Sequence, residues 1–331
     1  MLLTRGARVT GAVVCVLLAL IVAAWIVRDL TTADGPAQLW RFWESGPSGL
    51  GQASLTTTPY DLLLVVVYVA VALAALRSPL AAQALVAAAV ITLVVRLPAL
   101  WVVRADWMRQ WSGHDLRDRA LWSAFAALAG ALVLLIVAAA GRGPADGADD
   151  PVPTRPRLGA GVTAFVFLGV AGGAALALEG WTAVDVMDIS RRAYEHRFTG
   201  EAGLYTPLLG VPAGWLNVTL GALSLVAAVA AVARARFSRP LGLVVGLVLA
   251  GAGGIFLSSM VRHKAFPHID ELPARGQLAV YLQLFYLLAG VVVLLVFARR
   301  GVSDEAGFRP APSWQQPGFG PPPPSAPPPG W

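Results

Sequence analysis

The stretch TTTPYDLLLVVVYVAVALAALRSPL, residues 56–80, combines a Thr-Pro start, a long apolar run and an Arg-Ser-Pro hinge. A second stretch of this kind, LYTPLLGVPAGWLNVTLGALSLVAAVAAVARARFSRPL, occupies residues 204–241. An α-helix needs about 20 mostly apolar residues to cross a lipid bilayer, and both stretches supply them. The spacing of the prolines differs between the two. The pair therefore predicts membrane-spanning helices, with two related halves as a hypothesis.

The composition of the whole chain favours lipid as the solvent for most of its surface. Of its 331 residues, 57% are hydrophobic and only 13% are charged, against about 25% charged residues in a soluble domain. Lys264 is the only lysine, so the net charge of +6 comes almost entirely from arginine. This arginine bias, with many Ala, Val, Gly and Pro residues, indicates a GC-rich bacterial genome. The single cysteine, Cys15, excludes an intrachain disulfide.

Apolar segments long enough to span a bilayer occur eight times along the chain. The first resembles a secretory signal, but its apolar run continues through Trp25 to Val27, which predicts an uncleaved anchor. We therefore predict an all-α integral membrane protein. The predicted spans are 9–27, 60–76, 80–103, 120–140, 158–178, 208–233, 241–261 and 277–298.

Arginines set the predicted orientation, because the cytoplasmic loops of membrane proteins are enriched in Lys and Arg. The short hinges at 76–80 and 234–241 contain arginine and no acidic residue. With eight spans, these hinges lie on the same side as both chain ends. We expect a multi-pass protein of the bacterial plasma membrane with its N-terminus and C-terminus in the cytoplasm.

Four segments follow from these spans. Residues 1–140 would form a first four-helix membrane half, and residues 158–300 a second, parallel half. Residues 141–157, a polar segment rich in Pro and Gly, would be a cytoplasmic linker. Residues 301–331 contain too many prolines for a helix and predict a disordered Pro-rich tail.

The tail has two interpretations. A preformed polyproline-II segment loses little entropy when it docks in an aromatic groove, so the tail could bind a cytoplasmic protein partner. Trp314 and Trp331 would then be its anchors. The alternative is a solvated low-complexity tail without a partner.

Aromatic and histidine side chains concentrate in the segments predicted to lie outside. Tryptophan prefers membrane interfaces, and normally occupies both of them, but here the inner one is nearly empty. Residues 38–44, 105–119 and 184–198 each predict an amphipathic interfacial helix. The alternative is a substrate-binding lid over the bundle. The polar side chains of 184–198 are the candidate outer-face site: Asp185, Asp188, Arg191, Arg192 and His196.

Small residues recur every four positions in the seventh span, at Gly242, Gly246, Ala250 and Gly254. This spacing lines one helix face and predicts close packing against a neighbouring helix. Gly169 and Gly173 show the same spacing in the fifth span. Charged residues at the middle of the predicted spans, which mark ion routes, are missing. The charged residues near the outer ends of the spans are expected to reach water: Asp61, Arg96, Glu179 and Arg262.

Weak candidates for metal ligands lie at His263, His268 and Asp270. Imidazole and carboxylate groups bind zinc or iron. Pro267 separates the two histidines, however, so they do not share one helical face. Solvated loop histidines are the alternative. The sequence contains no HExxH, Walker or dinucleotide motif, and it predicts no cofactor and no catalytic residue.

Three functions fit the sequence. The leading one is a non-catalytic envelope scaffold or sensor that acts through its outer aromatic-rich loops and Pro-rich tail. The alternatives are a membrane enzyme acting on lipid-linked or headgroup substrates at the outer face, and a small-solute transporter. Membrane lipids are the expected partners. Arginines are not interleaved with aromatics in a nucleic-acid-binding pattern, and the oligomeric state stays open.

Overall fold

The computed structural model describes residues 2–45, 55–109, 112–143, 154–200, 207–299 and 302–303. Within these ranges, eight helices are long and apolar enough to cross a membrane, which confirms the predicted fold class. The helices are α1 (Arg5–Thr32), α3 (Pro59–Arg77), α4 (Ala81–Arg96), α7 (His114–Ala140), α8 (Leu158–Ile189), α10 (Ala213–Val232), α11 (Ser238–Arg262) and α12 (Ala274–Ala298). The span that contains α4 continues beyond Pro98 into the short helix α5 (Ala99–Val102).

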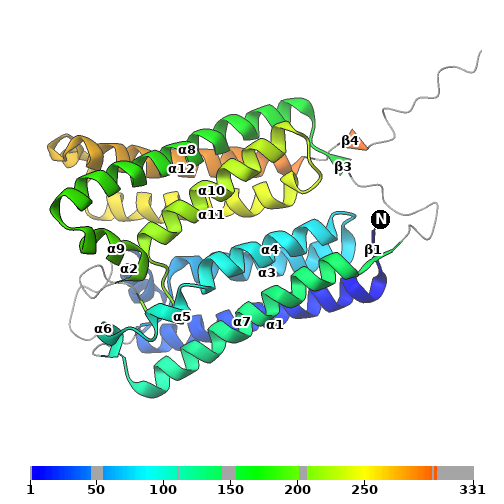
Figure 1. Cartoon of the computed structure of the whole chain (residues 1–331), viewed down its shortest axis with the longest axis horizontal. Helices are drawn as coiled ribbons and strands as arrows, with labels where there is room; N and C mark the ends of the chain where they lie inside the picture. Colours follow the sequence, from blue (N-terminus) through cyan, green and yellow to red (C-terminus); the bar gives the residue numbers. More distant parts are fainter. Residues whose placement is uncertain are drawn as a thin grey trace, which may run out of the picture.

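The long helices pack in two groups of four (Figure 1). In the first group, α1 contacts α3, α3 contacts α4, α4 contacts α7, and α7 contacts α1. The second group closes the same ring through α8, α10, α11 and α12. The groups meet chiefly where α11 packs against α3 and α4. Any up-and-down four-helix bundle forms such a ring, so an internal duplication stays a prediction.

Each group also has a short antiparallel strand pair next to its first and last helices. Strand β1 (Leu2–Leu3) precedes α1 and pairs with β2 (Arg142–Gly143), which follows α7. Strand β3 (Thr154–Arg155) precedes α8 and pairs with β4 (Val302–Ser303), which follows α12. The segments flanking each group are thereby joined in the same way.

The two ends of the helix groups differ. Figure 1 shows the short helices α2 (Pro36–Ser45), α5, α6 (Asp106–Arg109) and α9 (Arg191–Thr199) at one end, with the strand pairs at the other. We call these the loop end and the hinge end. The loop end corresponds to the predicted outer side of the chain, and the hinge end to the predicted inner side.

Two of the three predicted interfacial helices have different boundaries. Residues 38–44 lie in the single helix α2, as expected. The predicted helix at 184–198 is wrong, because α8 runs on to Ile189 and Ser190 then breaks the chain into a separate α9. Ser190 has extended backbone angles, and its hydroxyl accepts a hydrogen bond from the N–H of Ala193. In 105–119, α6 ends at Arg109 and α7 begins at His114.

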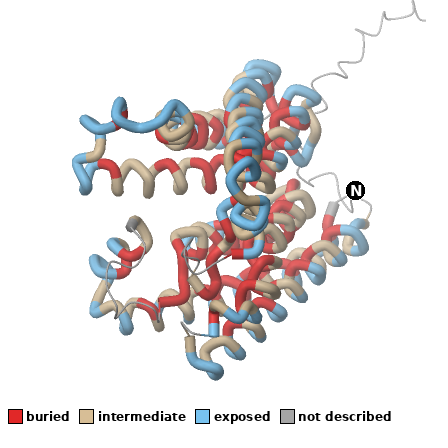
Figure 2. Tube along the Cα trace, turned by 60° about the vertical axis from the view of Figure 1, so that its left-hand side comes forward, coloured by how far each residue is buried: buried red, intermediate tan, exposed pale blue. Residues whose placement is uncertain are grey.

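Burial follows the ring packing. Figure 2 shows buried stretches recurring along the long helices, with exposed stretches on the outer faces and at the ends. The exposed face of α1 is apolar, with Val9, Val13, Leu17 and Leu20 each about half exposed. Continuous apolar faces of this kind are unfavourable in water. They favour a lipid surrounding for both groups.

Asp29, near the loop end of α1, is fully buried and holds the start of α3 in place. Its carboxylate accepts hydrogen bonds from the backbone N–H and the hydroxyl of both Thr56 and Thr57, at 2.6–3.1 Å. Arg28 forms an ion pair with the same carboxylate at 2.7 Å. A buried carboxylate is tolerated only when its lone pairs are satisfied in this way. The Thr-Thr sequence therefore fixes α1 against α3.

A second buried carboxylate, Asp61, lies in the first turn of α3. It accepts hydrogen bonds from the N–H and the hydroxyl of Thr58 at 2.6 and 3.0 Å, and it forms an ion pair with Arg96 of α4. The side chains of Asp61 and Arg96 are 0% and 4% exposed, so the expectation that they reach water is wrong. The reason is that each charge has an opposite charge on the adjacent helix. Two buried charges are tolerated when they are paired, whereas a single unpaired charge in the same place would be strongly unfavourable.

At the loop end, hydrogen bonds and one ion pair connect the two groups. Three of these bonds come from tryptophan indoles, which are apolar rings with a single donor. The indoles of Trp40, Trp101 and Trp215 donate to Ser258, Phe198 and Val94. The other connections join Thr56 to Leu209, and Glu44 of α2 to Ser258 and Arg262 of α11. The short helices at the loop end are therefore bonded to both groups.

Small residues allow α11 and α12 to approach closely. A Cβ on Gly242 would overlap the ring of Phe297, and one on Gly246 would lie 3.1 Å from Val293. Gly254 is looser, with its nearest neighbour atom at 4.0 Å. In α8, the expectation for Gly173 is wrong, since a Cβ there would meet open space within 4 Å. Gly172 makes the close contact instead, against the carbonyl of Gly221 in α10.

Candidate functional site

A polar cavity of about 240 Å³ lies at the loop end of the second group, between α8, α10 and α12, with α9 beside it. Its apolar wall is formed by small and medium side chains of α8 and α12. Its polar wall is unusual for a membrane helix bundle, because it contains two arginines. The polar side chains are Thr182 of α8, Arg197 of α9, Asn217 of α10, and Arg275, Gln283 and Tyr286 of α12. We call this the loop-end pocket.

Two residues that line the pocket, Arg197 and Asn217, are bonded to the buried carboxylate of Glu179 in α8. Arg197 donates from Nε and Nη2 to the two carboxylate oxygens of Glu179, at 2.9 and 2.7 Å. The side-chain amide of Asn217 donates to the second of these oxygens at 3.0 Å. This fork geometry is the strongest form of an Arg-carboxylate pair. It joins α8, α9 and α10, and it holds Arg197 rigidly at the edge of the cavity.

Helix α9 positions Arg197. The helix begins at the Ser190 cap and ends at Gly200, whose φ of 81° is a conformation that glycine adopts readily. The rings of Tyr194 and Phe198 pack edge to face, with centroids 5.4 Å apart. Burial and the nearby Glu179 carboxylate raise the pKa of Tyr194, although Arg197 opposes this shift. The short α9 thus lies against the hydrogen-bond network around Glu179 instead of extending into solvent.

Arg275 supplies the second positive charge. Its Nη1 lies 3.1 Å from a carboxylate oxygen of Asp185, with both side chains partly exposed. This contact is an ion pair without hydrogen-bond geometry, so the buried Nη1 donates to no acceptor among the described residues. The Nη1 is therefore available for a well-aligned hydrogen bond to an additional acceptor in the pocket.

The remaining polar groups are neutral. The hydroxyl of Thr182 donates to the carbonyl of Leu178 at 2.8 Å and is already satisfied. Within the part of the chain that the structure describes, the side chains of Gln283 and Tyr286 form no hydrogen bond, although Tyr286 is buried. The pocket therefore combines two guanidinium groups with an amide and a phenol that can still bond to a ligand.

The predicted outer-face residues separate into two sets. Asp185 lies beside the pocket through its ion pair with Arg275. Asp188, Arg191 and Arg192 are exposed and do not line the pocket, and Arg191 pairs instead with Glu195 at 3.1 Å. His196 is half-buried on α9 and is also absent from the lining.

The predicted metal ligands and tail anchors are the remaining candidate site residues. His268 bonds to Glu271 at 3.0 Å, and the described residues contain no group of three or more potential metal ligands, so His263, His268 and Asp270 do not assemble into one. The proposed tail anchors Trp314 and Trp331 lie outside the described residues.

The sequence analysis did not group the charged and amide residues that meet at the pocket. Glu179, Arg197 and Asn217 lie far apart in sequence, and Arg275 lies in a segment that showed no motif. A usable signal existed in Asn217 and Gln283, which are polar residues inside otherwise apolar runs. Such residues in membrane helices usually face the bundle interior.

Comparison with protein-family models, with curated proteins and with solved structures gave no match to this chain.

Proposed function

We propose that this protein is a non-catalytic sensor or scaffold of the cell envelope that binds a small anionic group in its loop-end pocket. The observation that supports the proposal is the convergence of Arg197 and Arg275 on one cavity. The buried Nη1 of Arg275 is ion-paired with Asp185 but forms no hydrogen bond to any described residue. Phosphate and carboxylate groups are the natural partners of paired guanidinium groups.

The size of the pocket restricts the ligand. Pockets for drug-sized molecules are about 300–1,000 Å³, whereas this one is about 240 Å³. A phosphate or carboxylate with a few attached atoms fits inside it, whereas a larger molecule would extend beyond the pocket. The amide of Gln283 and the phenol of Tyr286 supply neutral bonding partners for such a group.

Binding is favoured over catalysis by the state of the two carboxylates. General acid–base catalysis needs a carboxylate that can take up or release a substrate proton. Glu179 is buried and bonded to Arg197 and Asn217, and the partly exposed Asp185 is held in an ion pair with Arg275. The membrane-enzyme alternative predicts turnover that is lost in Asp185→Ala, and the transporter alternative predicts uptake in proteoliposomes.

The proposal also covers the membrane in which the protein resides and its orientation there. We infer a multi-pass protein of the bacterial plasma membrane with both termini in the cytoplasm, which would place the loop-end pocket outside. The arginine content of the hinge end supports this orientation. Labelling of single cysteines with a membrane-impermeant reagent tests it in a Cys15→Ala background. Ser112→Cys should react from outside intact cells, and Ser78→Cys should not.

The ligand is tested by thermal unfolding of the full chain in a mild detergent. Inorganic phosphate and glycerol 3-phosphate are titrated at constant ionic strength, with chloride as the reference anion. A ligand that binds only the folded state stabilises it by about 2.7 kcal/mol at 100 times its Kd, so the melting temperature should rise and then saturate. Arg275→Gln should remove this rise.

Arg191→Gln is the matched control, because Arg191 lies on adjacent α9 but is exposed and pairs with Glu195 outside the pocket. This variant should respond to the anion like the unmodified protein. If none of the anions raises the melting temperature above the chloride reference, the anion-sensing proposal is wrong. Equal loss in both variants would assign the effect to general surface charge.

The Pro-rich tail is a separate part of the proposal. Co-purification with mass spectrometry, comparing the full chain with a truncation ending at Arg300, tests it. A protein captured only by the full chain supports the scaffold function. Identical partners for both forms would contradict a role for Trp314 and Trp331.

A further inference from the structure

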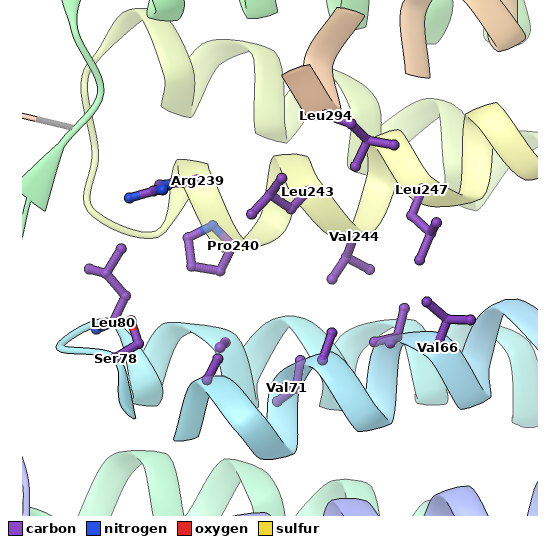
Figure 3. A pocket seen from close by; sticks show the side chains of 14 residues that line it. Val66, Val71, Ser78, Leu80, Arg239, Pro240, Leu243, Val244, Leu247 and Leu294 are labelled. Carbon is purple, nitrogen blue, oxygen red and sulfur yellow. Dashed lines mark hydrogen bonds between the residues drawn. The ribbon is translucent and has the colours of Figure 1, made fainter. Parts of the chain in front are cut away.

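A groove of about 440 Å³ lies between the two helix groups toward the hinge end (Figure 3). Figure 3 shows Leu243, Val244 and Leu247 of α11 on one side and Val66 and Val71 of α3 on the other, with their side chains facing the space between the helices. This groove is distinct from the loop-end pocket, which lies inside the second group.

The groove is apolar along its length and polar at one end. Its lining runs from Val66 to Ser78, a separation of about 18 Å at 1.5 Å per helical residue. That is close to half of the ~30 Å hydrocarbon core of a bilayer. Polar side chains enter the lining only at the hinge end, at Ser78 and Arg239. The groove thus has the length and the polarity of one phospholipid leaflet.

Arg239 is fixed at this mouth. Its Nε donates to the carbonyl of Phe297 at 2.8 Å and its Nη2 to the carbonyl of Ala298 at 3.4 Å, both at the end of α12. A guanidinium carries five N–H donors, so donors remain for a further acceptor. The carbonyls orient the side chain without neutralising its charge.

Arginines dominate the part of the hinge end that the structure describes. Every charged side chain that the structure describes at the hinge end is an arginine. Juxtamembrane arginines attract anionic lipids, and basic sites between membrane helices bind their headgroups. The arginines are Arg5, Arg8, Arg77, Arg142, Arg155, Arg157, Arg234, Arg236, Arg239 and Arg299.

We propose that this groove binds one anionic phospholipid from the hinge-end leaflet, with a phosphate at Arg239 and an acyl chain along α3 and α11. The apolar wall alone would not select a ligand, because lipid tails surround the protein everywhere else. Selectivity comes from the charge at the mouth. The bound lipid would fill the space between the two groups and hold their separation at the hinge end.

The experiment measures binding of phosphatidylglycerol and phosphatidylcholine, with identical acyl chains, to the full chain by native mass spectrometry. Phosphatidylglycerol should bind in one saturable step and more tightly than phosphatidylcholine. Arg239→Gln should weaken phosphatidylglycerol binding by about fivefold, the factor that one arginine near an anionic headgroup contributes. It should leave phosphatidylcholine binding unchanged.

Ala74→Phe tests the apolar part, because Ala74 lines the groove and a phenyl ring would fill it. This variant keeps the Arg239 contacts, so it tests lipid binding in the groove even if Arg239→Gln does not fold. It should weaken the saturable phosphatidylglycerol step at least fivefold.

The matched controls are Arg157→Gln, an exposed arginine at the same end, and Leu73→Phe, the neighbouring residue of α3 on its exposed face. Both should bind within twofold of the unmodified protein. Equal weakening by Arg157→Gln and Arg239→Gln, equal binding of the two lipids, or unchanged binding in Ala74→Phe would each overturn the proposal.

Discussion

The indole Nε1 of Trp215 donates a hydrogen bond to the backbone carbonyl of Val94, at 2.9 Å. In a regular helix this carbonyl would accept from the N–H four residues later, but that residue is Pro98, which has none. A side chain from α10 of the second group therefore completes a helix of the first group. Trp101 packs edge to face on the same indole, with ring centroids 5.5 Å apart.

Trp215→Phe should destabilise the protein although it conserves an aromatic ring. The substitution removes the donor and leaves the Val94 carbonyl without its partner, which costs about 1–3 kcal/mol. Thermal unfolding in detergent should show a clear decrease in melting temperature. Trp122→Phe is the control, because Trp122 is 73% exposed and should tolerate the same change with little effect.

A double-mutant cycle with Pro98→Ala tests the mechanism itself. Alanine restores an N–H at position 98, which can bond to the Val94 carbonyl within the helix. In this background Trp215→Phe should cost less than in the unmodified chain. Additive effects of the two substitutions would show that the indole bond and the proline are unrelated.

Asp29→Asn should strongly destabilise the contact between α1 and α3. The Asp29 carboxylate accepts hydrogen bonds from Thr56, Thr57 and Arg28. An asparagine amide nitrogen would face these donors with donors of its own. Losing bonds to a buried charge suggests a cost of about 3 kcal/mol or more. Asp34→Asn, in the exposed turn that follows α1, should change the melting temperature little.

Removing one partner of the Asp61–Arg96 pair should cost more than removing both. A lone buried charge costs about 3–5 kcal/mol, whereas replacing the pair by apolar residues of similar volume can be nearly neutral. Asp61→Leu and Arg96→Met, singly and together, give the measurement by thermal unfolding. A double variant at least as unstable as the worse single variant would contradict the prediction.

Gly290→Ala should loosen the packing between α11 and α12. A Cβ on Gly290 would overlap the backbone of Gly246 and Ala250, and overpacking of this kind costs about 1–3 kcal/mol. Gly173→Ala is a matched glycine substitution with open space around the new methyl group. By helix propensity, it should be neutral or stabilise by up to about 1 kcal/mol. Similar melting temperatures for the two variants would show that the close approach is not limiting.

The spanning helices could be predicted from sequence because their signal is local. A run of about 20 apolar residues is sufficient for a helix in lipid, whatever its neighbours are. The break at Ser190 was missed because Val184 to Phe198 has continuous amphipathic spacing, and only the backbone conformation of Ser190 separates α8 from α9. A serine cap and a serine within a helix look alike in a single sequence.

The candidate pocket could not be predicted because its contacts are non-local. Glu179 was expected to reach water, yet it is 3% exposed and bonded to Arg197 and Asn217. Nothing in the spacing of these residues selects this pairing over a solvated one. The choice depends on how α8, α9 and α10 pack, and periodicity does not encode that packing.

The hydrogen bonds and the ion pair described above between the two helix groups lie at the loop end, whereas an apolar groove lies between the groups toward the hinge end. The two groups can therefore tilt relative to each other about their contacts at the loop end. A helix of 20 residues is about 30 Å long, so a relative tilt of a few degrees moves the hinge ends of the helices by about one to two ångströms. A small change of tilt at the loop end would therefore displace the hinge ends of the two groups relative to each other.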